Sequence, residues 1–494
     1  MFLRLLKVGI FSLILLVLLW MLSGILERKE SQTKIAPFLD RAEDVDVLFL
    51  GSSHVLSAVY PMELFSEYGI TSYNLGSYNN TVPVSYWMMR CALDACTPEL
   101  VVLDIDCIGQ QEVLGSGSAD VHTALDGFPL TWTKARAIWD LMGDPEVMDD
   151  DGNRYADLKW EYLFPMLLYH SRWANLSADD FAPKQNQHLG AYMSVNVAQP
   201  AEYSIVADAA DDAGPGFEYL RKIVQECRGR GIEVLLINAP YPAANDDDQR
   251  YSNAVYYVAE ECGVDYIDFV YMDQIVDYST DCYDAASHLN PSGARKVTDY
   301  LGEYMQAVYG LEDHRSDEAY AAWAADYDAY VDEKIQMLRE QNDLAAFLML
   351  LHDQDFSACV YVPEDCPVYG DEHMLRMLQN VGRRHLFEAD TYDSVWADGL
   401  EPLEQLEAAS YERSPYLFVI DREAETCFEV KGCVDDRIDA SFGSLQMESG
   451  VLYQLQQEGT QTVLFEADDL TSAVCVAVID ERTGDVAMVR KFNQ

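Results

Sequence analysis

A serine, a histidine and a carboxylate stand where they could carry out acyl transfer. Ser53 follows Gly51 and Ser52 directly after the apolar run "VDVLFL". A serine hydroxyl is a weak nucleophile unless a base lies within hydrogen-bond reach. His288, in "CYDAASHLNPSGARK", is the candidate base, and Asp284 is the candidate carboxylate that orients its imidazole ring. These residue types predict attack by Ser53 on a carbonyl carbon.

Each of these side chains also has a structural alternative. Ser53 could cap the helix that follows it, while Ser52 supports the turn. His54 is adjacent to the nucleophile and is expected to pack against its neighbours rather than to react. His288 could cap or pack, and Asp281 is a second carboxylate upstream of it.

The elements that must position these residues alternate between short apolar strands and helices. Strands that are apolar on both faces predict a parallel sheet covered by helices on both sides. Ligands bind such sheets at the carboxyl ends of the strands, where Ser53 is expected. Strands are expected at residues 45–50, 71–76, 99–106, 232–240 and 264–269, and helices at 82–96, 216–231, 252–262 and from Ser292 onward.

Four sequence blocks resemble the SGNH/GDSL hydrolase superfamily, in particular membrane-anchored bacterial envelope members that begin with a Gly-Ser-Ser-His block. The blocks are "LFLGSSH", "SYNLGS", "VVLDID" and "SHLNPSGARKVTDYL", within residues 44–308. The resemblance implies a flavodoxin-like parallel sheet sandwiched by helices. It also implies that Ser53 is the nucleophile and His288 the base, and that the backbone N–H groups of Ser53 and Gly76 form the oxyanion hole.

Two departures from the family pattern bear on activity. The family's acid usually stands three residues before the histidine, where this chain has Ala285, so Asp284 must reach the ring from four residues away. The family's Gly-x-Asn-Asp block, which supplies a third oxyanion donor, has no counterpart here, and Asn80 is the expected substitute. Loss of one such donor costs ~3–4 kcal/mol of transition-state stabilisation, so slow, narrow or absent activity is compatible with the sequence.

The first residues predict a membrane anchor. Val8 to Leu26 contain no charged residue and, as a helix, would span ~28 Å, close to the ~30 Å hydrocarbon core of a bilayer. Arg4 and Lys7 precede the run and favour a cytoplasmic N-terminus. No small-residue cleavage site follows, so an uncleaved signal anchor with the main domains outside the membrane is expected.

The composition argues against some classes of binding partner and cofactor. The net charge of −51 argues against nucleic acid, because the phosphate backbone would be repelled. The eleven cysteines form no CxxC pair and no zinc-finger spacing, and no metal or other cofactor is expected. Cys427 and Cys433 flank an expected strand and could bridge in an oxidising compartment.

Changes in pattern along the chain predict five segments. The C-terminal one carries two strand–turn–strand hairpins and is expected to be an α+β, mostly β accessory domain. The segments are the membrane anchor (1–30), a stalk (31–43), the SGNH hydrolase-like domain (44–312) with a helical insertion at about 130–197, a connecting helix (313–342) and the accessory domain (343–494).

The sequence therefore predicts a membrane-anchored, extracytoplasmic serine esterase or O-acyltransferase. Its expected substrates are acyl esters, acetyl esters first, on cell-envelope polysaccharide, and a membrane protein of polysaccharide modification is an expected partner. The alternative is a catalytically inactive scaffold or glycan-binding envelope protein on the same fold. A domain that faces the cytoplasm would follow if the anchor were inverted.

Overall fold

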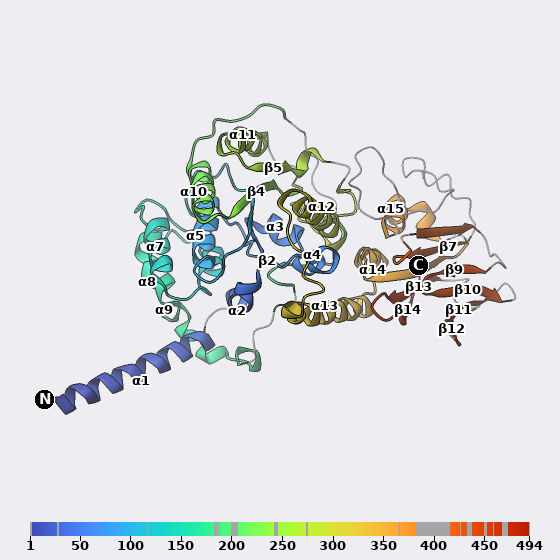
Figure 1. Cartoon of the computed structure of the whole chain (residues 1–494), viewed down its shortest axis with the longest axis horizontal. Coiled ribbons are helices and arrows are strands. Elements are labelled where there is room, and N and C mark those ends of the chain that lie inside the picture. The colour runs from blue at the N-terminus through green and yellow to red at the C-terminus, as the bar shows by residue number, and fades with distance from the viewer. Residues whose placement is uncertain are drawn as a thin grey trace. The chain divides into compact units, whose positions relative to one another are not determined.

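The chain divides into two compact units (Figure 1). The first comprises residues 1–192, 203–270 and 308–320, and the second comprises residues 193–202, 271–307 and 321–494. The computed structural model describes residues 2–26, 29–115, 117–181, 186, 188–198, 206–241, 246–272, 275–364, 366–381, 415–424, 426–431, 437–448, 452–457, 459–466 and 473–493.

A five-stranded parallel sheet forms the centre of the first unit. The strands lie in the order β2-β1-β3-β4-β5, which is a doubly wound order. In register, Val47 of β1 is opposite Ser72 of β2 and Leu100 of β3. The bounds are β1 (Val47–Leu50), β2 (Ser72–Asn74), β3 (Leu100–Asp104), β4 (Glu233–Asn238) and β5 (Asp265–Asp268).

Burial on both faces explains why these short segments form a parallel sheet. Every residue of β1, β2 and β3 is buried, which requires cover on both sides. The prediction of a helix-covered parallel sheet is therefore confirmed. The helices that connect these strands include α3 (Ser53–Ala58), α4 (Pro61–Tyr68), α5 (Val82–Ala92), α10 (Pro215–Arg230) and α11 (Asp246–Cys262).

Helix ends follow local sequence. The Thr81 side chain accepts the N–H of Val84 at the start of α5, and Gly231 ends α10 in the left-handed conformation. Helix α10 packs against both α5 and α11. The remaining short helical turns of the unit are η1 (Ala42–Asp44), η4 (Phe269–Tyr271) and η5 (Glu318–Tyr320).

The N-terminal region contains two helices, α1 (Phe2–Leu26) and α2 (Lys29–Arg41). Residues 4–26 are long and apolar enough to cross a membrane, a property that signal sequences share. Most of the segment expected to be a stalk (31–43) lies in α2. Ile35 and Phe38 are fully buried, because their spacing places both on one face of α2.

The stretch from β3 to α10, which includes the expected insertion at about 130–197, contains several helices besides α6, which precedes the insertion. Its elements are α6 (Ser118–Leu125), α7 (Trp132–Leu141), α8 (Tyr155–Leu163), α9 (Met166–Tyr169), η2 (His170–Asn175) and η3 (Ala178–Asp180). The acidic stretch between α7 and α8 is a tight hairpin, closed by an antiparallel bridge between Met148 and Arg154.

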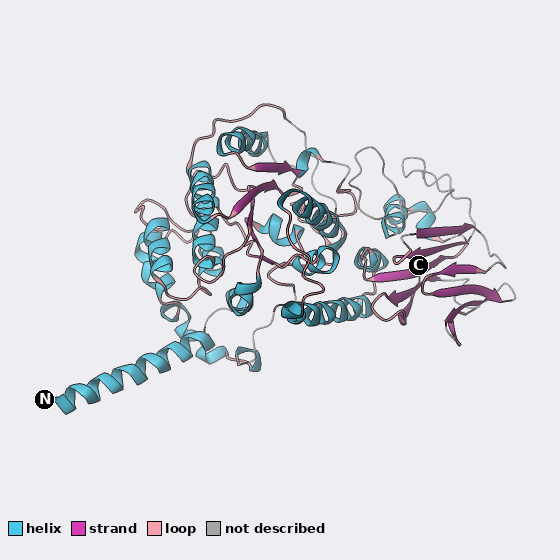
Figure 2. Ribbon diagram, viewed as in Figure 1, coloured by secondary structure: helices cyan, strands magenta, loops and turns pink. Residues whose placement is uncertain are grey.

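The second unit contains antiparallel sheets (Figure 2). One has the order β14-β13-β6-β7-β8 and the other β12-β11-β10-β9. The two predicted hairpins, β7–β8 and β13–β14, are confirmed, but β6 lies between them and joins them into one sheet. The strands are β6 (Phe356–Val362), β7 (Tyr416–Asp421), β8 (Thr426–Lys431), β9 (Ile438–Ala440), β10 (Gly443–Glu448), β11 (Leu452–Gln457), β12 (Thr460–Phe465), β13 (Ala473–Asp480) and β14 (Val486–Asn493).

Helices complete the second unit. They are α12 (Pro291–Tyr309), most of which belongs here, α13 (Ala321–Glu340), α14 (Leu344–Leu351), η6 (Pro367–Gly370) and α15 (Glu372–Val381). The long charged helix expected near residues 316–342 corresponds to α13. Lys334 of α13 is buried against the carboxylates of Asp353 and Asp355.

Nine described cysteines have free thiols, and seven of them are buried. The buried ones are Cys91, Cys96, Cys227, Cys282, Cys359, Cys366 and Cys475. Cys433, one partner of the bridge considered from the sequence, lies outside the described residues, so that pairing stays a prediction.

Candidate active site

The carboxyl end of β1 turns sharply at Gly51 and places Ser53 at the start of a helix. Gly51 has φ +144°, and a Cβ there would lie 2.6 Å from the Cβ of Asp104 on the neighbouring strand β3. Only glycine combines this backbone conformation with so close an approach. The turn therefore depends on Gly51, as the sequence block suggested.

Ser52, and not Ser53, caps the helix α3. The Ser52 hydroxyl accepts the backbone N–H of His54 at 3.1 Å and donates to Asp104 Oδ2 at 3.3 Å. Ser53 is then the first helical residue, and it is the one partly exposed residue in the run 51–60. A partly exposed serine at this end of a parallel sheet is well placed to meet a ligand.

Asn74, at the end of β2, holds the next part of the site. Its side-chain amide donates to the carbonyl groups of Val55 (2.8 Å) and Val59 (3.0 Å), and its Oδ1 accepts the N–H of Gly76 at 3.0 Å. The fully buried Asn74 thus ties β2 to α3, the helix that begins with Ser53. The sequence analysis missed this positioning role, although "SYNLGS" contains the residue.

The other two predicted oxyanion donors are engaged within the fold. The Gly76 N–H is taken by Asn74, as described above. The Asn80 side-chain amide is buried and donates to the Gly51 carbonyl at 3.2 Å and to Ser85 Oγ at 2.9 Å. Either group would have to exchange or share its present partner to bind an oxyanion.

A buried carboxylate lies beneath the Ser52–Ser53 turn. Asp104 Oδ1 accepts the N–H of Ala239 at 3.1 Å. Burial, together with the nearby carboxylate of Asp106, raises the pKa of Asp104 to about 7. The two acidic residues of "LVVLDID", Asp104 at the end of the strand and Asp106 just after it, were the available signal for this group.

His54 belongs to the surroundings of the turn. Its ring lies 4.4 Å from the ring of Tyr241, and its Nε2 is 4.0 Å from Asp106 Oδ1. The side chain is buried. It packs as the sequence analysis expected.

The second unit brings Asp284 and His288 together. Asp284 Oδ2 is 2.8 Å from His288 Nδ1, and its Oδ1 accepts the N–H groups of Ala286 (3.0 Å) and His288 (3.2 Å). Ser287 adopts φ +66°, and the loop is closed by a bridge between Cys282 and Leu289. This tight loop absorbs the four-residue spacing that departs from the family pattern.

The surroundings hold the imidazole of His288 in place. The ring of Tyr283 stacks on it with ring centres 5.4 Å apart. The Tyr283 N–H donates to the His288 carbonyl at 2.8 Å. A carboxylate on Nδ1 selects the tautomer in which Nε2 can accept a proton.

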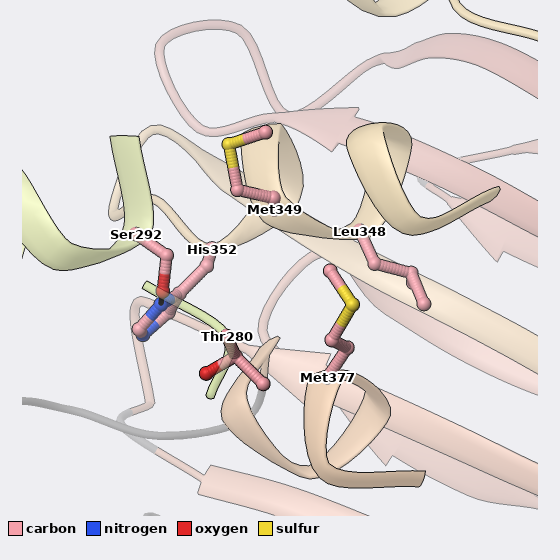
Figure 3. A pocket seen from close by; sticks show the side chains of 6 residues that line it. All are labelled: Thr280, Ser292, Leu348, Met349, His352 and Met377. Atoms are coloured by element: carbon pink, nitrogen blue, oxygen red, sulfur yellow. Dashed lines mark hydrogen bonds between the residues drawn. The ribbon is translucent and has the colours of Figure 1, made fainter. Parts of the chain in front are cut away.

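Asp281, the other upstream carboxylate, forms a buried ion pair and does not contact the His288 ring in any contact that the structure describes. It is fully buried, 2.6 Å from Lys296 Nζ, and it accepts the hydroxyl of Ser292 at 2.8 Å. Ser292 Oγ is also 2.6 Å from His352 Nδ1, and the two line a cavity of about 10 Å³ (Figure 3). A space of that size holds at most one water molecule.

Ser53, Gly76 and Asn80 thus belong to the first unit, whereas Asp284 and His288 belong to the second. The pairing of Ser53 with His288 stays a prediction. Within either unit, no three described His, Cys, Asp or Glu side chains bring their ligand atoms together, and no metal site is assigned.

Comparison with known proteins adds little information about the fold or the activity of this chain. No family model matches the chain, and no curated protein matches it. Among solved structures, an acetyl xylan esterase from the rumen bacterium Butyrivibrio proteoclasticus is similar over 54% of this chain and 65% of that chain, with 8% identity and a TM-score of 0.24. The chain spans less than two thirds of that enzyme's length, and a superposition this loose assigns neither fold nor activity.

Proposed function

We propose that this protein is a serine esterase or O-acyltransferase of the SGNH/GDSL type, anchored in a membrane by α1 with its main units outside. The strongest support is the 2.8 Å contact between His288 Nδ1 and Asp284 Oδ2, made despite the unusual spacing. The half-exposed Ser53 at the carboxyl end of β1 is the matching nucleophile. The proposed substrates are acyl esters, acetyl esters first, of cell-envelope polysaccharide.

In the proposed reaction Ser53 Oγ attacks the ester carbonyl carbon while His288 Nε2 takes the hydroxyl proton. The C–O bond to the sugar then breaks, and His288 returns that proton to the departing sugar oxygen. Water or an acceptor hydroxyl attacks the acyl-serine, gives its proton to His288, and releases the carboxylic acid or the new ester. The same proton finally restores the Ser53 hydroxyl, so the cycle balances.

Each remaining group has a role in this cycle. Asp284 orients the imidazole and stabilises the imidazolium that forms in both steps. The backbone N–H groups of Ser53 and Gly76, with the Asn80 amide, are proposed to receive the oxyanion. The envelope glycan and a membrane protein of polysaccharide modification are the proposed partners.

A second candidate function is an inactive scaffold or glycan-binding protein on the same fold. It is favoured by the contacts of the predicted oxyanion donors. The Gly76 N–H bonds to Asn74, and the Asn80 amide bonds to Gly51 and Ser85. A site with few available donors would stabilise the transition state poorly.

A fluorophosphonate probe separates the two functions. We expect labelling of the full chain in detergent and its loss in Ser53→Ala. Ser66→Ala is the matched control, because Ser66 is also a partly exposed helical serine. A folded protein that is not labelled, or labelling that persists in Ser53→Ala, would contradict the catalytic proposal and leave the scaffold.

A further inference from the structure

The insertion contains several large apolar side chains that are exposed in the part of the chain that the structure describes. They lie in or beside α9, η2 and η3 and include Leu167 (54% exposed), Trp173 (71%) and Phe181 (64%). Phe164 and Leu168 are also exposed. Soluble proteins rarely expose apolar side chains in such a group, and those that do commonly bind a membrane or a partner there. We call these five residues the apolar patch.

The patch lies where α1 ends. Both α9 and η2 contact α1, and Figure 1 shows them at the end of that helix from which the chain enters the first unit. Arg172 of η2 donates from Nη1 to the carbonyl oxygen of Leu26, the last residue of α1, at 2.6 Å. Its Nη2 is 3.0 Å from Asp180 Oδ1. Arg172 thereby fixes this part of the insertion to the point where the apolar helix stops.

The charges near the patch do not select anionic lipid. Residues 162–178 contain no Asp or Glu. However, Arg172 is paired with Asp180, and Leu168 of the patch lines a cavity together with Asp149, Asp151 and Glu161. Burial of apolar side chains, rather than attraction to anionic headgroups, is therefore the expected source of lipid binding.

We propose that the apolar patch is a second membrane contact, inserted into the headgroup region of the leaflet from which α1 emerges. The inference rests on the proposed membrane anchoring by α1 and not on the proposed esterase activity. If α1 spans the bilayer, Leu26 lies at its surface, and the patch is held at the same depth. Tryptophan favours the headgroup layer because its ring is apolar and its N–H can form hydrogen bonds there. Phenylalanine and leucine side chains are buried at the boundary between headgroups and acyl chains.

Two contacts would restrict the first unit more than one helix can. Without the patch, the unit would be oriented only by its contacts with the end of α1. Insertion of the patch would fix one face of the unit toward the lipid. Substrate would then approach the protein from a defined direction relative to the membrane surface.

The test uses the full chain in nanodiscs of phosphatidylcholine and phosphatidylglycerol. A diazirine amino acid is placed at one position at a time, and lipid adducts are measured by mass spectrometry. Position Leu167 reports on the patch and position Leu15 on the span of α1. Position Tyr257 is the control, since it is 66% exposed on α11, which Figure 1 shows far from α1 in the same unit.

We expect lipid adducts at Leu15 and at Leu167, with a yield at Leu167 about tenfold above that at Tyr257. Adducts at Leu15 without adducts at Leu167 would overturn the inference and leave the anchor intact. Cross-links from Leu167 to a second protein chain would also overturn it. A Leu15 position without lipid adducts would remove the anchor and the inference together, while esterase activity is measured independently.

A second measurement uses the fluorescence of the protein's own tryptophans and needs no photoreactive amino acid. Lipids brominated near the headgroup quench nearby tryptophan fluorescence, and part of that quenching should vanish in Trp173→Phe. The substitution is exposed and preserves an aromatic ring, so the fold should be unaffected. Equal quenching in Trp173→Phe and the unaltered chain would contradict the proposed insertion.

Discussion

Two carboxylates precede His288, and their surroundings separate a proposed catalytic role from a structural one. Asp284 has a side chain that is 37% exposed and lies against the imidazole. Asp281 is fully buried against Lys296, whose side chain is only 7% exposed. The sequence placed both upstream of the histidine but could not tell them apart, because burial depends on how the loop packs on α12 and its neighbours.

Substitution of Asp284 should therefore affect activity, whereas substitution of Asp281 should affect stability. Asp284→Asn should lower ester turnover or fluorophosphonate labelling by roughly 10²–10⁴-fold with little change in stability, because the ring loses its orienting charge. Asp281→Asn should destabilise the fold by roughly 3–5 kcal/mol, because Lys296 would be left buried without its partner. Labelling rates and denaturant unfolding of both variants give the comparison. Unchanged labelling in Asp284→Asn would contradict its proposed role.

Asp104 should make stability depend on pH. Its pKa is raised to about 7 by burial, so between about pH 4 and 7 the folded protein retains a proton that the unfolded chain has lost. The stabilisation is complete below the unfolded pKa and is lost as the pH rises through 7. In Asp104→Asn this component should be absent, so the difference in unfolding free energy between the two proteins should change by roughly 2–3 kcal/mol from pH 5 to 8. A difference that is constant with pH would contradict this.

At the scale of elements, a buried side chain of the neighbouring strand β2 helps to hold α3, the helix that begins at Ser53. Asn74 of β2 bonds to the carbonyl groups of Val55 and Val59 in and after α3. It also bonds to the N–H of Gly76. Correct placement of Ser53 thus depends on contact between β2 and α3, and not only on the turn at Gly51.

Removal of this side chain should loosen the helix. Asn74→Ala would lose three hydrogen bonds at a buried position, with an expected cost of about 3 kcal/mol. Ser53 labelling per folded molecule should fall as well. Asn79→Ala is the control, because Asn79 is an exposed asparagine of the same connection that contacts Asp120. Equal stability of the two variants, measured by urea unfolding, would exclude the positioning role.

The sequence was most informative where burial is continuous. Runs such as "VLFL" and "LVVL" predicted the parallel strands, because each residue type favours full burial. The segment before β1 was less clear, since a few apolar residues spaced along α2 gave a mixed, polar composition. Hydrogen-bond partners could not be predicted: nothing in "SYNLGS" indicates that Asn74 would occupy the N–H of Gly76, since that contact depends on the path of the chain between them.

At the scale of the whole molecule, the arrangement of anchor and units determines where any activity takes place. Residues 4–26 can span a bilayer, and their orientation decides on which side everything after Leu26 lies. Arg4 and Lys7 precede the apolar stretch and favour retention of the N-terminus inside. The proposed function requires this orientation, which would place both units outside.

Membrane extraction and a reporter test this topology. The full chain should resist alkaline extraction, and a chain that begins after Leu26 should be released. A phosphatase fused after Gln494 should be active only if it has been exported. Intact mass should show that α1 is retained. A mass that lacks α1 would identify a cleaved signal sequence, and an inactive phosphatase would indicate the inverted orientation.

The buried thiols have a consequence for folding in an oxidising compartment, where the proposed topology would place them. Burial raises the pKa of Cys91, Cys96 and Cys227 to about 12, so at neutral pH on the order of one in 10⁵ of each is a reactive thiolate. Air and oxidants would act on them only during the interval before folding is complete. Rapid collapse of the sheet and helices that enclose these three sulfur atoms would protect them from oxidation.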